Sequence, residues 1–175
     1  MRLCKHVCFT FNFLKCSVIK IAINGSGTSI VSDGTSHQFL FLTSGSTSSS
    51  KNLVISINSI KLSKFNNHTV NGGAVYINGL SGISFVNVTF SYNTALSGGA
   101  IYMTQSSYIY ISKCSFLNNI AISNGGAITI YSNSNNLYVT DTGLSGNYAG
   151  DSGGALVAYS SVRNIVVQRL SLIHI

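Results

Sequence analysis

The sequence predicts an all-β chain folded as a right-handed parallel β-helix, with about 26 to 28 residues in each coil. The first observation is a repeat: residues 90–102 (FSYNTALSGGAIY) return as 116–129 and 144–157, and more loosely as 65–76. The second is the regular step, because the Gly-Gly pairs start at residues 72, 98, 125 and 153. The third is composition: proline is absent, 17 glycines are present and only 7% of residues are charged, which favours turn-rich β structure over long helices.

The chain is long enough for one domain with a core, and 45% of its residues are hydrophobic. We expect the β-helix to cover residues 18–172, with its clearest repeats at 65–158. Residues 1–17 are left unassigned, since their short apolar stretch is a weak signal peptide. Residues 173–175 form a tail that is a candidate for a non-native end. The truncated last repeat indicates a fragment of a longer exported protein.

Before the clear repeats, short strands are predicted from alternating apolar residues. Residues 18–24 alternate through three isoleucines, and residues 24–27 (NGSG) are typical of a turn. A second strand is expected at 38–42, a polar loop at 43–50 (TSGSTSSS), and a third strand at 53–62. Each coil should therefore contain several short strands joined by corners.

Within the repeats, equivalent positions identify the inward-facing side chains. Counting back from the Phe slot, the positions seven, five and two residues earlier are mostly apolar: Ile83, Ile109, Leu137 and Ile165; Phe85, Ile111, Val139 and Val167; Val88, Cys114, Thr142 and Leu170. Three residues before the slot come Asn87, Lys113, Asp141 and Arg169, where the alternation breaks. A polar residue at a break in alternation predicts a corner with that side chain outside.

A second strand follows each glycine pair. Its inward positions are expected to be Val75, Ile101, Ile128 and Leu156, then Ile77, Met103, Ile130 and Ala158. The residues between them should face outward: Tyr76, Tyr102, Thr129 and Val157. Stacking coils about 4.8 Å apart would pair the backbone of each coil with its neighbours and place like residues above one another.

Three sets of repeated residues are predicted to form structural columns. Phe90, Phe116 and Leu144 should lie in one interior column. Asn93, Asn119 and Asn147 should occupy a turn with φ > 0 and hydrogen-bond through stacked amides. The glycines should form a corner that needs φ > 0 and close backbone approach: Gly72, Gly73, Gly98, Gly99, Gly125, Gly126, Gly153 and Gly154. His68 takes the Asn place in the first copy and is interpreted as a turn residue, not a metal ligand.

A leucine-rich-repeat-like solenoid is the alternative fold. Residues 85–95 fit the spacing of its L-x-x-L-x-L-x-x-N-x-L motif. Two features count against it: leucine is rare in the key positions, and the second half of each copy alternates β-branched residues after Gly-Gly where a helix would be required. The β-helix therefore explains more of the pattern.

The pairing of F-x-x-N (residues 90–93 and 116–119) with GGA[ILV] (residues 72–75, 98–101, 125–128 and 153–156) resembles the chlamydial polymorphic membrane protein repeat. Residues 65–158 carry the resemblance, with Leu144 in place of Phe and His68 in place of Asn as departures. The resemblance implies a right-handed β-helix at the cell surface, in some members an adhesin. It therefore implies an extracellular or cell-surface location.

Enzyme activity is the competing hypothesis, because pectate lyases and polygalacturonases are also right-handed β-helices. Their chemistry needs clustered carboxylates, whereas the acids here are Asp33, Asp141 and Asp151, on separate parts of the repeat. We expect no catalytic residue, metal ligand or cofactor site in this segment. The alternative function is a polysaccharide-active enzyme with its catalytic coils outside the segment.

The candidate ligand surface is made of outward tyrosines: Tyr76 over Tyr102 on one face, and Tyr110 beside Tyr138 on another. Such columns offer rigid contact area for a host or neighbouring-cell surface protein or glycan. The alternative is that they only stabilise the sheet. The ten basic residues are scattered, so nucleic acid is not an expected partner, and no apolar run is long enough for a transmembrane span.

Overall fold

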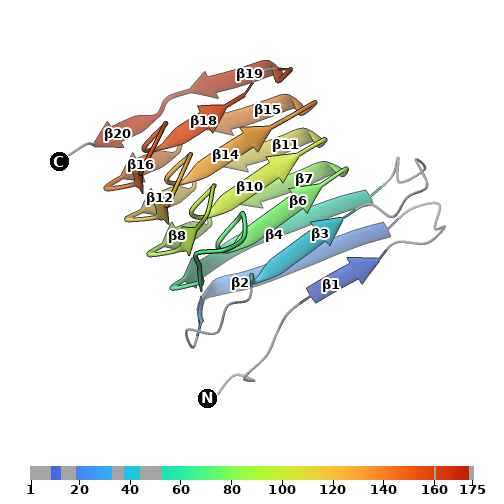
Figure 1. The fold of residues 1–175 in the computed structure, drawn as a ribbon. Coiled ribbons are helices and arrows are strands. Elements are labelled where there is room, and N and C mark those ends of the chain that lie inside the picture. Colours follow the sequence, from blue (N-terminus) through green and yellow to red (C-terminus); the bar gives the residue numbers. More distant parts are fainter. Residues whose placement is uncertain (1–8, 13–18, 33–37, 44–52, 160, 174–175) are drawn as a thin grey trace.

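The computed structural model describes residues 9–12, 19–32, 38–43, 53–159 and 161–173. Over these residues it contains strands and turns but no helix. The strands stack as a parallel β-solenoid of about five turns (Figure 1). The all-β parallel solenoid predicted from the repeat is confirmed, and the leucine-rich-repeat alternative is not needed, because extended strands follow the glycine pairs.

One side of each coil belongs to a six-stranded sheet. In spatial order its strands are β1 (Phe9–Asn12), β3 (Leu40–Thr43), β6 (Val75–Asn78), β10 (Ile101–Thr104), β14 (Ile128–Tyr131) and β18 (Leu156–Ala158). The pairs are parallel, as expected for successive turns of one solenoid.

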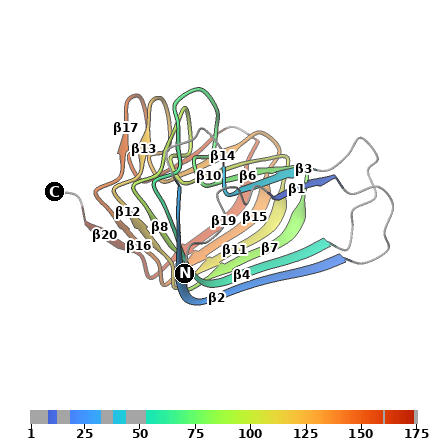
Figure 2. The same ribbon diagram turned by 90° about the horizontal axis from the view of Figure 1, so that it is seen from below.

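A second sheet covers two further sides of the coil (Figure 2). One side holds β2 (Ile19–Val31), β4 (Leu53–Ser63), β7 (Ser81–Val86), β11 (Ser107–Ser112), β15 (Asn135–Thr140) and β19 (Arg163–Gln168). The other holds β8 (Thr89–Ser91), β12 (Ser115–Leu117), β16 (Gly143–Ser145) and β20 (Ser171–Ile173). The long strand β4 joins them, because it pairs with both β7 and β8.

A small sheet closes the coil. It contains β5 (Asn66–Asn67), β9 (Thr94–Ala95), β13 (Ile120–Ala121) and β17 (Tyr148–Ala149). All of its pairs are parallel as well. Beyond it the chain reaches the glycine pair and enters the first sheet again.

The interior column predicted at the Phe slot is confirmed. Phe90 pairs with Phe116, which pairs with Leu144, and all three are almost completely buried. The two phenyl rings stack with centroids 4.8 Å apart and planes 9° apart. This spacing matches the distance between hydrogen-bonded strands, so the apolar core is built from side chains that repeat with the coil.

The corner predicted before the Phe slot is also confirmed. Asn87, Lys113, Asp141 and Arg169 all have φ between 50° and 54° and are exposed. A left-handed residue breaks the inward-outward alternation, which explains why the next residue returns to the interior. Val88, Cys114 and Thr142 occupy that interior position.

The glycine pairs lie at a corner where the backbone conformation and the close packing of coils both exclude a side chain. The first glycine of each pair has φ between 63° and 72°. The second glycine lies too close to the next coil for a side chain. At Gly99 an added Cβ would collide with the carbonyl oxygen of Gly126, and at Gly126 with that of Gly154. Both halves of the prediction, positive φ and close backbone approach, are therefore confirmed.

The predicted conformation of the Asn slot is wrong, although its stacked amides are confirmed. Positive φ belongs to the preceding residue in each coil: Tyr92 (56°), Asn118 (53°) and Gly146 (63°). The asparagine itself lies inside the coil, at 0% exposure for Asn93 and Asn119. Its role is to satisfy buried backbone groups where the chain turns.

The register predicted for the first copy is wrong by three residues. Leu62, not Phe65, pairs with Phe90. The backbone N–H of Phe65 instead donates to Oδ1 of Asn93, so Phe65 lies level with the Asn column. His68 is exposed and follows β5. The repeat pattern concealed this slip because Leu62 and Phe65 are both large and apolar. Phe65 also matches the phenylalanines that begin two of the later copies.

Two predictions concern the first coils. The turn predicted at 24–27 is a bulge inside the continuous strand β2, where the pairing with β4 shifts between Asn24 and Thr28. Ser26 and Gly27 have φ of 45° and 86° there. The predicted loop at 43–50 begins at the last residue of β3, and its residues 44–50 lie outside the described residues.

Candidate functional site: two tyrosine columns

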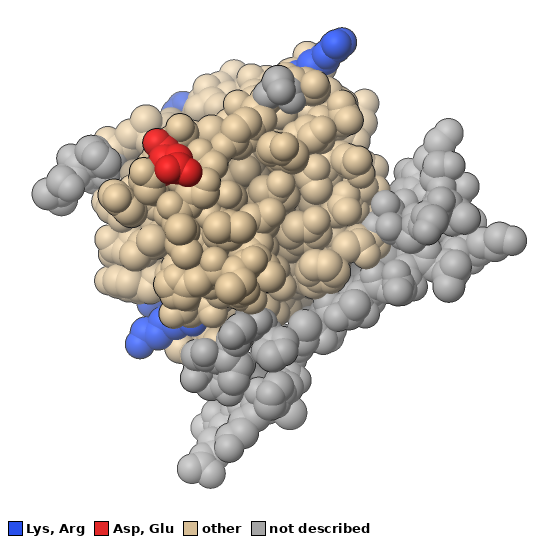
Figure 3. All heavy atoms as spheres, viewed as in Figure 1, with Lys and Arg blue, Asp and Glu red and all other residues tan. Residues whose placement is uncertain are grey.

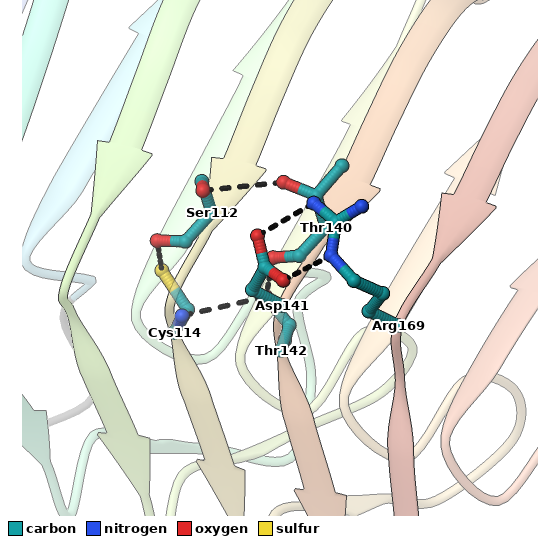
Figure 4. Close-up of polar contacts among 6 residues, drawn as sticks. All are labelled: Ser112, Cys114, Thr140, Asp141, Thr142 and Arg169. Carbon is teal, nitrogen blue, oxygen red and sulfur yellow. Dashed lines mark hydrogen bonds and ion pairs between the residues drawn. The ribbon is translucent and has the colours of Figure 1, made fainter.

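The acidic side chains within the described residues are each held by a neighbour. Asp141 forms a two-pronged ion pair with Arg169, in which Nη2 lies 2.9 Å from Oδ2 and Nε contacts Oδ1 (Figure 4). The arginine lowers the pKa of the Asp141 carboxyl, and Lys113 adds to the effect. Asp151 accepts a hydrogen bond from Oγ of Ser123 at 2.7 Å. Asp33 lies outside the described residues.

Cys114 is a buried thiol that follows Lys113, the corner residue of the neighbouring coil (Figure 4). Its Sγ donates toward the carbonyl oxygens of Ser112 at 3.3 Å and Phe85 at 3.4 Å. Burial raises the pKa of the thiol to about 11, which keeps it in the poorly reactive neutral form. Across the described part of the chain, no group of three or more His, Cys, Asp or Glu side chains gathers as metal ligands do.

The first tyrosine column lies outside the six-stranded sheet and is longer than predicted. Phe41 stacks on Tyr76 with centroids 4.9 Å apart, and Tyr76 stacks on Tyr102 at 5.6 Å with planes 2° apart. The column continues to Tyr131, whose ring centroid lies 6.2 Å from that of Tyr102. It ends at Tyr159, whose ring centroid lies 5.2 Å from that of Tyr131. Five aromatic rings thus follow one another across neighbouring coils.

The sequence analysis missed Phe41, Tyr131 and Tyr159. Tyr102 pairs across the strands with Thr129, and Tyr131 lies two residues further along β14. The rings therefore change position along the strand while remaining on the same outward face, because side chains two residues apart share a face. A search for outward aromatics at both positions of this strand would have found the continuation.

Tyr102 faces outward as predicted but is not an exposed contact residue. Only 8% of it is accessible, because the rings of Tyr76 and Tyr131 flank it and the glycine corner packs close to its backbone. Burial, with the neighbouring phenols, raises the pKa of Tyr102 to about 12. This part of the column therefore contributes to packing more than to a contact surface.

The second column lies outside the long-stranded sheet. Tyr110 of β11 and Tyr138 of β15 are direct partners across the strands. Their rings stack at 4.9 Å with planes 5° apart, and Tyr110 is 43% exposed. The structure therefore brings together both predicted pairs, on two different faces, and leaves the second pair open.

Hydroxyl side chains lie beside this second pair in two directions. Oγ of Ser84 donates to Oγ of Ser56 at 3.1 Å, one coil away. Two residues further along β11 and β15, Oγ1 of Thr140 donates to Oγ of Ser112 at 3.2 Å. The face thus presents hydroxyl groups in rows beside two phenol rings.

The other face, which carries β6, β10 and β14 and the first tyrosine column, is nearly uncharged. Figure 3 shows acidic and basic side chains close to its margins.

Stacking determines what the columns can bind. Rings stacked face to face cover one another's faces and leave their edges and phenolic hydroxyls accessible. Such a surface offers hydrogen-bonding groups and ring edges. The ring faces inside each stack are closed to a sugar ring or a cation.

One family model matches the chain, that of the Chlamydia polymorphic membrane protein repeat, at residues 87–104 and 113–131. Each matched segment begins at a left-handed corner residue and ends with a strand of the six-stranded sheet, β10 or β14. No curated protein and no solved structure matches the chain. Two neighbouring coils of this parallel β-solenoid therefore match the model of the Chlamydia polymorphic membrane protein repeat.

Proposed function

We propose that this segment belongs to the repeat region of an exported cell-surface protein and acts as a rigid, adhesive stalk. The polymorphic membrane protein repeat and the parallel solenoid support the surface-protein part of the proposal. Within the described residues, no helical segment has the length and apolar character to cross a bilayer. A stack of coils joined by parallel strands suits a spacer, because each coil is held by both neighbours.

The observation that carries the adhesive part is the open pair Tyr110 and Tyr138. Tyrosine provides rigid contact area with a polar group at its tip, and is favoured in binding surfaces for that reason. The hydroxyl rows beside the pair complement hydrogen-bonding groups of a partner. The proposed partner is a protein or glycan on a host or neighbouring cell.

The proposal includes no catalytic role for this segment. The Asp141 carboxylate is neutralised by Arg169 at an exposed corner, and Asp151 lies in the loop before the last glycine pair. Acid-base hydrolysis of a glycan needs two carboxyl groups flanking one bond. The positions of these two acids therefore support a binding function over a polysaccharide-cleaving one.

The test replaces both tyrosines of the open pair by serine and measures binding of the purified segment to cells and to arrayed glycans. We expect Tyr110→Ser with Tyr138→Ser to lower binding at least tenfold. Val166→Ser is the matched control, because Val166 pairs with Tyr138 in the same outward row. Unfolding midpoints of all variants exclude a loss of structure. Unchanged binding of the folded double variant would overturn the adhesive role of this face.

A further inference from the structure

Tyr110 and Tyr138 are held in an arrangement that favours reaction between their rings. The two residues pair directly on β11 and β15, and the strands fix their register through backbone hydrogen bonds. The rings are parallel to within 5°, with centroids 4.9 Å apart. Tyr110 is 43% exposed and Tyr138 is half-buried, so a reagent in solution can reach the pair.

We propose that Tyr110 and Tyr138 form an oxidative modification site, at which a one-electron oxidant, such as a haem peroxidase with hydrogen peroxide, couples the two rings into dityrosine. Each tyrosine loses one electron and its phenolic proton to become a neutral radical. The radicals join through a new carbon–carbon bond between ring positions next to the hydroxyls. The two ring hydrogens at those positions then move to oxygen and restore both phenols. In total the pair loses two hydrogen atoms, and one hydrogen peroxide becomes two waters.

The geometry selects this pair over the other tyrosines. Tyr102 is buried between its neighbours, and the Tyr102 and Tyr131 rings are 6.2 Å apart and tilted by 29°. The Tyr131 and Tyr159 rings meet edge to face at 67°. Among the described residues no ring contacts the remaining exposed tyrosines, Tyr92, Tyr108 and Tyr148. Proton loss from Tyr102 is further disfavoured by its raised pKa.

The bond would join two adjacent coils covalently. Tyr110 and Tyr138 are separated in sequence by Lys113, so tryptic cleavage places them in different fragments, residues 65–113 and 114–163. A cross-link between the fragments survives denaturation, whereas the noncovalent solenoid does not. The product is therefore a joined pair of peptides lighter by two hydrogens.

The experiment treats the dilute folded protein with peroxidase and hydrogen peroxide, denatures and digests it with trypsin, and measures the joined peptide by mass spectrometry and dityrosine fluorescence. We expect the joined peptide in the wild type and at least a tenfold loss in Tyr110→Phe and in Tyr138→Phe. Phenylalanine keeps the stacked ring and removes only the phenol, so these variants should fold normally.

Tyr102→Phe is the matched control, because it removes the other tyrosine that has a partner ring in the second fragment. We expect it to leave the joined peptide unchanged. Absence of the joined peptide from the oxidised wild type would overturn the proposal. So would its persistence in Tyr110→Phe or its loss in Tyr102→Phe, since either would assign the bond to other residues.

Discussion

The column of asparagines inside the coil and the tyrosine pair outside it both repeat in register, but they are held differently. Asn119 is fully buried, and its side-chain amide hydrogen-bonds to the coil before and the coil after. The side chain of Tyr110 contacts that of Tyr138 by ring stacking at an open surface. The inner column therefore reinforces the register that the strands set, whereas outer rings can move by two residues, as they do between Tyr102 and Tyr131.

Breaking the inner column should have the largest effect. Asn119→Ala removes the acceptor used by the backbone and side-chain N–H groups of Asn93, and the donor to the carbonyl of Phe90. Each buried group left without a partner costs about 1 to 3 kcal/mol. We expect the free energy of unfolding to fall by about 4 kcal/mol, as measured by urea denaturation.

The control for that change lies one residue away. Asn118 is exposed with φ of 53°, and the equivalent position in the next coil is already Gly146. Asn118→Gly should therefore change stability by less than about 0.5 kcal/mol. Equal losses for Asn118→Gly and Asn119→Ala would contradict the distinct role given to the buried amide.

The glycine corner should also be sensitive to substitution, because successive coils are in close contact there. In Gly126→Ala the new Cβ meets the carbonyl oxygens of Gly154 and Tyr148, which are backbone atoms of the next coil. Overpacking of this kind costs about 3 kcal/mol. Gly143→Ala is the control, since an added Cβ there has no atom within 4 Å. Thermal unfolding should separate the two variants, and similar melting temperatures would argue against close backbone approach.

The two outer columns should respond unequally to serine. Tyr102→Ser removes a buried ring with aromatic neighbours on both sides and should cost about 2 kcal/mol. Tyr110→Ser removes a ring that is 43% exposed and should cost less than about 1 kcal/mol. Urea denaturation of both variants tests the difference. A larger loss at Tyr110 would reverse the assignment of packing to one column and contact to the other.

A smaller effect depends on pH. The buried thiol of Cys114 keeps its proton in the folded state until its raised pKa of about 11, whereas the unfolded thiol loses it near its ordinary pKa of 9.0. The protonated thiol therefore makes its full contribution to the free energy of unfolding below pH 9. This contribution is lost as the pH rises from 9 to 11. Cys114→Val, which copies Val88 in the same interior position, should reduce this alkaline loss by about 1.4 kcal/mol at pH 10. Identical alkaline profiles would contradict the burial of the thiol.

Much of this architecture could be predicted from the sequence, because stacking forces equivalent residues into equivalent environments. The repeat period predicted the length of each coil. The break in alternation at Lys113 and its equivalents predicted the corner. The glycine pairs were interpretable because only glycine fits both positive φ and a carbonyl oxygen at Cβ distance. At the corner the constraint is met by an exposed polar residue, and at the pair by glycine, so each left a clear signal in the sequence.

The errors came from positions where two residues satisfy the same constraint. Leu62 and Phe65 are both large and apolar, so the repeat alone did not decide which one pairs with Phe90. Asparagine suits a left-handed turn and a buried hydrogen-bonding role equally, and the structure uses it for the second. The open tyrosine pair was predicted correctly, but the burial of Tyr102 depends on its neighbours' rings in adjacent coils, which one coil does not specify.

The amides of the inner column all point the same way. Nδ2 of Asn93 donates to Oδ1 of Asn119, and Nδ2 of Asn119 donates to Oδ1 of Asn147. The column therefore has a direction that matches the direction of the chain, and a coil stacked upside down would set donor against donor. Duplicated coils are compatible with the rod only in their original orientation, so the solenoid can lengthen by whole turns while its polarity is preserved.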